Sequence, residues 1–153
     1  MNFDNSYMRT ALENALYAQV SGEIPVGAVI VQRRSGQIIS SGYNLVETEC
    51  NPTKHAEMIA IDGACKALKS KNLSECDMYV TLEPCAMCSA AISHTRIGRL
   101  FYGASDSKQG AVEHGPRFFT QSTCMHRPEV YDGIMAEEAR TLLKTFFEHL
   151  RNN

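Results

Sequence analysis

The sequence predicts an α/β fold, a sheet covered by helices on both faces. Two observations predict this fold: short apolar runs typical of strands alternate with segments of helical spacing, and the alternation continues through the middle of the chain. The length of 153 residues fits one compact domain, 1–153, and is too short for two. Hydrophobic residues make up 44% and charged residues 21%, values typical of a globular protein with a core.

The first half of the chain is predicted to contain two helices and a hairpin. Apolar residues follow helical spacing after Asn5 and Ser6, so the chain is expected to open with a helix. Residues 27–32 and 37–43 are typical of strands joined by a turn at 33–36. A second helix is expected from about residue 55 to 68, with small residues along one face.

The second half is predicted to continue the alternation. A short strand at 78–81 precedes Pro84, which suits the first turn of a following helix. Another strand is expected at 97–103, and a long irregular segment runs from 105 to about 128. A last short strand at 129–131 leads to a final helix with apolar residues at three- and four-residue spacing between 136 and 150.

Several classes of protein are excluded by composition. The N-terminus has no basic region followed by an apolar stretch, so we do not expect a secretory signal. The longest nearly apolar run, Ile24 to Val31, is far below the ~20 residues of a membrane helix. We therefore expect a cytoplasmic protein without a membrane partner. The net charge of -2 does not indicate nucleic-acid binding, although residues 92–128 carry an excess of arginine and lysine that could contact phosphates.

Cysteine usage indicates metal or redox chemistry at one place only. The six cysteines stand at positions 50, 65, 76, 85, 88 and 124, and only Cys85 and Cys88 are clustered. A disulfide framework is not expected in a chain without an export signal. The four scattered cysteines are expected to be inert and mostly buried.

His55-Ala56-Glu57 and Pro84-Cys85-x-x-Cys88 together predict a zinc site. Each motif stands at the predicted start of a helix, where the partial positive charge favours the thiolates that bind zinc. Cys85 and Cys88 are three positions apart, so their sulfurs face the same side, and His55 adds an imidazole nitrogen. Three protein ligands leave the fourth tetrahedral position open, as in catalytic zinc sites. We therefore expect one Zn²⁺ per chain.

Glu57 distinguishes a catalytic site from a structural one. It lies about 200° around a helix axis from His55, so it is not an obvious fellow ligand. Zinc lowers the pKa of a bound water from ~15.7 to ~7. A carboxylate beside that water is suited to move its proton, which makes Glu57 the expected catalytic residue.

Two other interpretations of the cysteines remain open. A closed structural zinc site would need one more ligand, and Cys50 or Cys76 could supply it. A redox role for Cys85 and Cys88 would leave the motif at 55–57 unexplained.

These motifs resemble the signature of the cytidine deaminase-like superfamily. Further segments resemble bacterial tRNA-specific adenosine deaminases, and the resemblance covers most of the chain. They are residues 23–29, 51–57, 79–85, 96–99 and 102–110, together with the pair Phe146-Phe147.

The resemblance implies a fold and a reaction. The fold is a three-layer α/β/α sandwich with a five-stranded mixed sheet, and the active site is completed at a homodimer interface. The reaction is hydrolytic deamination of the wobble adenosine to inosine in the anticodon stem-loop of a tRNA. Glu57 shuttles protons to the ring and to the departing ammonia.

The resemblance also implies a set of substrate-binding residues. Ile24, Pro25 and Val26 wall the pocket, and Asn44 contacts the target nucleotide. The backbone of Ala56 lies near the base, and the backbone of Glu83 receives the leaving amine. Asp106 and Lys108 lie along the anticodon loop, and Phe147 or Phe146 grips neighbouring nucleotides together with Arg151.

Some of these residues also have ordinary structural interpretations. Asn44 could be a turn residue at the end of a strand. At least one of Phe146 and Phe147 is expected in the core, and Asp106 and Lys108 could be a solvated pair. The chain also departs from the family as its better-known members have it: residues 112–124 are richer in aromatics, Met125 replaces an amide, and Ser105 replaces an arginine. These departures lie at expected RNA contacts and leave the zinc motif intact.

Two further functions are compatible with the motifs. Deamination of a free nucleobase, nucleoside or nucleotide of guanine or cytosine type uses the same core. A zinc-stabilised RNA-binding module without catalysis is a third possibility, and the intact Glu57 argues against it.

Overall fold

The computed structural model describes residues 5–153, and its helices and strands follow the predicted order. In chain order they are α1 (Ser6–Val20), β1 (Gly27–Gln32), β2 (Ile38–Tyr43), α2 (Ala56–Leu68), β3 (Cys76–Leu82), α3 (Ala86–Thr95), β4 (Arg99–Ala104), the 3₁₀ turn η1 (Phe118–Thr120), β5 (Glu129–Tyr131) and α4 (Ala136–Arg151). The hairpin, the helix at 56–68 and the last strand agree with the prediction to within a residue.

Three elements have boundaries that differ from the prediction. Strand β3 is longer at both ends, and β4 begins at Arg99 because residues 96–98 form the turn that leaves α3. Arg96 adopts a left-handed conformation there, and Ile97 donates its N–H to Ile92 O. Pro84 lies before α3 and not in its first turn, because Cys85 is the N-cap.

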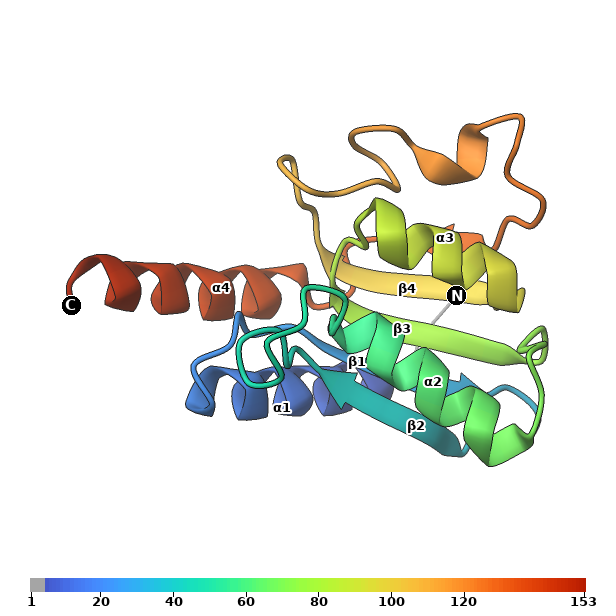
Figure 1. Ribbon diagram of the computed structural model, residues 1–153, viewed down its shortest axis with the longest axis horizontal. Helices are drawn as coiled ribbons and strands as arrows, with labels where there is room; N and C mark the ends of the chain where they lie inside the picture. Colours follow the sequence, from blue (N-terminus) through green and yellow to red (C-terminus); the bar gives the residue numbers. More distant parts are fainter. Residues whose placement is uncertain (1–4) are drawn as a thin grey trace.

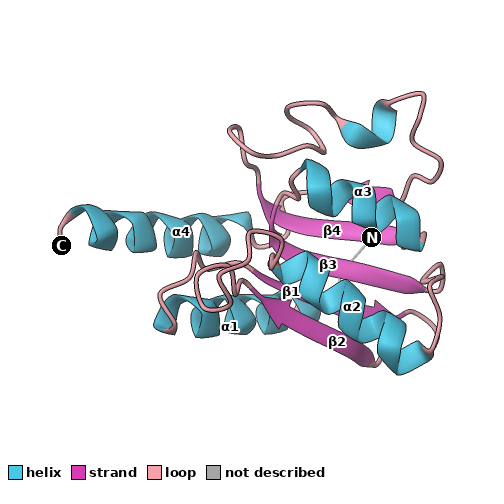
Figure 2. Cartoon of the chain, viewed as in Figure 1, coloured by secondary structure: helices cyan, strands magenta, loops and turns pink. Residues whose placement is uncertain are grey.

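The five strands form one mixed sheet in the order β2-β1-β3-β4-β5. Strand β1 runs antiparallel to both β2 and β3, whereas β3, β4 and β5 are parallel. Figure 2 shows the sheet as a twisted surface with helices on both sides. The five-stranded mixed sheet is therefore confirmed.

Side chains alternate between two cores along each strand. Ala28, Ile30, Met78 and Val80 point to the core shared with α2 and α3. Their neighbours along the strands, Val29, Val31 and Tyr79, point to the opposite core together with Phe101 of β4. This second core contains Met8 and Ala11 of α1. This period of two buries both faces and explains the near-continuous apolar runs in β1 and β3. The chain is thus a three-layer α/β/α sandwich (Figure 1).

Close approach of a helix to the sheet fixes the start of α2. A Cβ on Gly42 of β2 would lie 2.6 Å from Ala56 O and 3.0 Å from Ala60 N. Glycine therefore lets the first turn of α2 lie directly on the strand. The carboxyl ends of β3 and β4, where Leu82 pairs with Ala104, lie at the same end of the sheet as the last residue of β2. In parallel α/β sheets, ligands bind at the carboxyl ends of the strands.

Candidate metal centre and active site

The end of β2 positions His55. The Ala56 N–H donates to Asn44 Oδ1 at 2.9 Å, and Asn44 Nδ2 donates to Ile24 O at 3.1 Å. Asn44 therefore ties the end of β2 to the first residue of α2 and to the segment before β1. His55 is the N-cap of α2, in an extended conformation with φ -76° and ψ 152°. Its ring consequently projects from the helix start toward α3.

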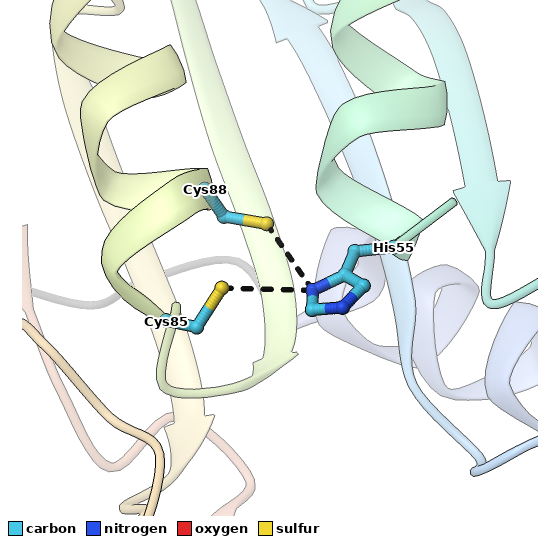
Figure 3. Close-up of side chains that lie close together, drawn as sticks. All are labelled: His55, Cys85 and Cys88. Atoms are coloured by element: carbon cyan, nitrogen blue, oxygen red, sulfur yellow. Dashed lines mark hydrogen bonds between the residues drawn. The ribbon is translucent and has the colours of Figure 1, made fainter. Parts of the chain in front are cut away.

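The start of α3 brings two sulfurs to that ring. Cys85 is the N-cap of α3 and Cys88 lies in its first turn. Figure 3 shows both sulfurs turned toward His55 Nδ1, from which Cys85 Sγ is 3.6 Å and Cys88 Sγ is 3.5 Å away. Two helix starts that are far apart in the sequence thus place three potential metal ligands together.

The spacing of these three atoms fits tetrahedral zinc. Zn–S bonds of about 2.3 Å and a Zn–N bond of about 2.0–2.1 Å place sulfur and nitrogen about 3.6 Å apart across a tetrahedral angle. Both measured N···S distances agree with this value. Within residues 5–153, the cluster of ligand atoms around His55 contains only Cys85 and Cys88. Cys50 is exposed, and Cys76 begins β3 at the opposite end from the site, so neither closes it as a fourth ligand.

The electrostatics of the cluster favour a thiolate. A hydrogen bond from the Cys88 thiol is the largest effect that lowers the pKa of Cys85 to about 4. The same bond, with burial, raises the pKa of Cys88. Cys85 is therefore ionised at neutral pH, which is the form that binds zinc. Metal binding at such a site displaces the remaining thiol proton.

Glu57 lies in the first turn of α2 and is 4% exposed. Burial raises the pKa of its carboxyl group, which also hydrogen-bonds with Cys88. It lines the same cavity as His55 and Cys85 but is not part of their ligand cluster. An acid with a raised pKa beside three potential metal ligands is suited to accept and return protons.

A cavity of about 680 Å³ opens in front of these groups. Its size falls within the range of small-molecule sites, about 300–1,000 Å³. Of the residues expected to bind substrate, six line it: Ile24, Val26, Asn44, Glu83, Asp106 and Phe147. Phe146 also lines the cavity and is 7% exposed, whereas Phe147 is 43% exposed. Phe146 is thus the phenylalanine with the core role, and Phe147 is the one available to a ligand.

Four expected substrate residues lie outside the cavity lining. Pro25 and Ala56 are buried behind it, and the Ala56 N–H is already bonded to Asn44. Lys108 and Arg151 are exposed, the latter at the end of α4 (Figure 1).

Two buried carboxylates near the cavity have side-chain roles that the sequence did not predict. Glu23 is 1% exposed and accepts hydrogen bonds from Glu47 N, Thr48 N and Thr48 Oγ1. Glu83 was expected to act through its backbone, yet its side chain is also fully buried and hydrogen-bonded. The sequence did contain a signal for these roles, because both acids stand next to apolar strands. A carboxylate buried there without hydrogen-bond partners would destabilise the fold.

A second group of ligand-type atoms, from Glu83, Glu113 and His114, does not resemble a metal site. The Glu83 oxygens accept hydrogen bonds from four backbone N–H groups and from the His114 ring. Glu113 accepts hydrogen bonds from the hydroxyl groups of Tyr102 and Ser105. These oxygens already have the partners that a cation would replace.

Among residues 5–153, the structure contains no helix that is both long and apolar enough to cross a membrane.

A catalytic zinc site differs from a structural one in having only three protein ligands, with an acid beside the open fourth position. This arrangement on this fold is that of a zinc-dependent hydrolytic deaminase. Comparison with known proteins agrees with this class. The model of the cytidine and deoxycytidylate deaminase zinc-binding region matches residues 1–104. A guanine deaminase from Nitrosomonas europaea superposes with a TM-score of 0.80 at 24% identity, over 95% of this chain and 85% of its own, and this likeness concerns the fold alone.

Two further comparisons identify the branch of the family. The tRNA-specific adenosine deaminase of Rickettsia bellii (strain RML369-C) is 57% identical over 145 residues, which is 95% of this chain and 100% of that protein. A structure solved in a study of A-to-I editing by tRNA:A34 deaminases at the wobble position has a TM-score of 0.88 and 46% identity, and the match covers 92% of this chain and 100% of that one. The chain belongs to the tRNA-specific adenosine deaminases within the zinc-binding cytidine and deoxycytidylate deaminase family.

Proposed function

We propose that this protein converts the wobble adenosine of a tRNA anticodon to inosine by hydrolysis. The observation that carries the proposal is the contact of buried Glu57 with the His55, Cys85 and Cys88 cluster at the cavity. The family relationship along nearly the whole chain supports adenosine in tRNA as the substrate.

The reaction balances as adenosine plus water giving inosine plus ammonia. His55, Cys85 and Cys88 would hold the zinc ion, which when bound would lower the pKa of a coordinated water toward neutrality. Glu57 accepts a proton as the water oxygen bonds to C6, and it donates a proton to ring N1. A further proton reaches the exocyclic nitrogen through the same carboxylate, the C6–N6 bond breaks, and ammonia leaves.

The remaining cavity residues are proposed to hold the flipped-out base. Ile24, Val26 and Phe147 supply apolar walls, and Asn44 lies where it can orient the nucleotide while it fixes the start of α2. An extruded base held between apolar side chains is typical of enzymes that modify nucleobases. Asp106 lines the cavity, and the exposed Lys108 and Arg151 are proposed to contact the RNA backbone.

Inosine formation in a synthetic anticodon stem-loop with a wobble adenosine tests this function. The matched control RNA has the same stem-loop with the adenosine moved one position, and the matched protein control is Glu57→Ala. We expect inosine only from the native protein acting on the wobble adenosine. Ammonia from free guanine, cytidine or adenosine, with the stem-loop unchanged, would instead assign the protein to deamination of free bases or nucleosides.

We also propose that the chain forms one deaminase domain, acts as a homodimer and works in the cytoplasm, where tRNA is processed. The family resemblance supports the dimer, in which the partner completes the active site. Sedimentation of the zinc-loaded protein is expected to give the mass of two chains. A monomer that is fully active on the stem-loop would contradict the shared site.

A further inference from the structure

The side chain of Glu83 is the central anchor of an irregular segment beside the active site. Glu83 directly follows Leu82, the last residue of β3, and Glu83 and Pro84 connect this strand to Cys85. The Glu83 side chain has no exposed surface. A carboxylate in such a position is stable only when it is hydrogen-bonded on all sides.

Both oxygens of this carboxylate are bound by residues 106–114. Oε1 accepts hydrogen bonds from Asp106 N at 2.9 Å and from His114 Nδ1 at 2.8 Å. Oε2 accepts hydrogen bonds from the N–H groups of Val112, Glu113 and His114 at 3.1, 3.1 and 3.2 Å. The segment 106–114 is neither helix nor strand, so these N–H groups depend on the carboxylate for partners.

The segment is also tightly wrapped around the carboxyl group. A Cβ on Gly110 would overlap the carboxyl carbon and Oε2 of Glu83, so only glycine fits there. The Ala111 N–H donates to Pro84 O at 2.9 Å, which adds a direct bond to the residue before Cys85. The carboxylate therefore joins the zinc-binding turn to a segment 23 or more positions away.

The anchored segment contributes residues to the cavity lining. Asp106 and Gln109 line the cavity, and Lys108 is exposed between them. We propose that Glu83 is a positioning residue, whose carboxylate holds residues 106–114 in the shape that receives the RNA around the target base. This inference rests on the proposed function for the identity of the ligand.

Preorganisation is the physical reason for the expected effect. A segment that is already ordered loses little conformational entropy when RNA binds, whereas a loosened segment must be ordered at the expense of affinity. Because Glu83 acts through the segment, its loss is expected to raise KM for the stem-loop more than it lowers kcat.

Glu83→Gln is the sharpest variant because it keeps the size of the side chain. It replaces one acceptor oxygen with an NH₂ group that faces backbone donors, so at least one hydrogen bond is lost. Gly110→Ala is an independent second variant that forces the segment away from an intact Glu83. Asp77→Asn is the matched control, since Asp77 is 3% exposed and lies at the other end of β3, where it pairs with Arg33 and Arg99.

Four quantities are measured on each zinc-loaded protein: amide hydrogen exchange, zinc content, and both KM and kcat for the stem-loop. In Glu83→Gln and Gly110→Ala we expect faster exchange confined to residues 106–114, one zinc per chain, and KM raised about tenfold or more, as for loss of a hydrogen bond to a charged acceptor. Asp77→Asn is expected to melt at a lower temperature with KM unchanged.

Different failures have different meanings. Unchanged exchange at 106–114, an unchanged KM, or loss of zinc in Glu83→Gln would overturn the inference, the last by showing that the residue supports the metal site instead. A KM raised equally in Asp77→Asn would also overturn it, because general destabilisation would then suffice. If the native protein leaves the stem-loop unchanged, the proposed function is contradicted. The exchange data would still decide whether Glu83 anchors the segment.

Discussion

Buried carboxylates in this protein differ in role because their partners differ. Asp77 is paired with two arginines, and Glu83 is bound by backbone N–H groups, so the oxygens of both already have polar partners. Glu57 is as deeply buried, yet burial dominates its environment and raises its pKa. Glu57 is therefore suited to accept and return a proton beside the metal ligands.

Replacement of Glu57 by glutamine should separate chemistry from metal binding. The amide cannot accept or return protons, so kcat for the stem-loop is expected to fall by about 10²–10⁴-fold, the contribution typical of general acid–base catalysis. The ligands are untouched, so zinc content should stay at one per chain. Atomic absorption and single-turnover inosine assays measure the two quantities. Loss of zinc in this variant would make Glu57 a ligand, contrary to its position outside the cluster.

Replacement of Cys88 by alanine should remove metal and activity together. Cys88 is fully buried and its sulfur lies 3.5 Å from His55 Nδ1, so the remaining two ligands cannot complete the site. Cys124→Ala is the matched control, because Cys124 is also a buried free cysteine but lies outside the cluster. We expect zinc and inosine formation to persist in the control alone. A Cys88→Ala protein that retains both would show that the ligand set is wrong.

At the scale of elements, the sequence was informative wherever a local pattern determines the structure. Strand β1 could be predicted because both of its faces are apolar, and the cysteine pair of the zinc motif because Cys85 and Cys88 are spaced within one helix turn. The strand order, with β1 between β2 and β3, could not be predicted, since it depends on pairing between distant residues such as Ala28 and Val80. The buried side chains of Glu23 and Glu83 were missed for the same reason: their partners lie 23 or more positions further along the chain.

Gly42 links the sheet to the active site at this scale. Alanine there would press a methyl group against the backbone of Ala56 and Ala60, and α2 would have to shift. Overpacking of this kind costs about 1–3 kcal/mol in the free energy of unfolding. Because α2 carries His55 and Glu57, we expect kcat to fall as well. Chemical denaturation and the inosine assay test this, and a variant with native stability and native kcat would contradict the close approach.

His114 should titrate above the ordinary value for histidine. Its hydrogen bond to Glu83 is the largest of the effects that raise its pKa. The charged form is thus favoured in the folded protein, so the bond stabilises the segment 106–114 below pH ~6.5, and this stabilisation is lost as the pH rises through the raised pKa. Imidazole NMR shifts measure the value in the native protein. In Glu83→Gln we expect it to return toward ~6.5, and an equal pKa in both proteins would contradict the pairing.

For the whole molecule, the distribution of charge matters more than its sum. The net charge is -2, yet Arg96, Lys108, Arg117 and Arg127 are exposed in the stretch between α3 and β5. Arg99 belongs to the same stretch but is bound by Asp77, at the end of the sheet away from the cavity. The cations available to RNA are therefore fewer than the sequence suggests, and Lys108 is the one that lies between the cavity-lining residues Asp106 and Gln109.

A small number of phosphate contacts predicts a definite salt dependence. With about four contacts and a slope of about -0.7 per contact, affinity for the stem-loop should fall about 50-fold between ~50 and ~200 mM salt. Glu57→Gln is the protein to use, because it binds the RNA without consuming it, and fluorescence anisotropy gives the affinity. Lys108→Ala should make the slope less steep by about 0.7 if that lysine contacts one phosphate. A flat salt response would exclude the RNA backbone as a major contact, and an unchanged slope in Lys108→Ala would assign the phosphates to the other cations.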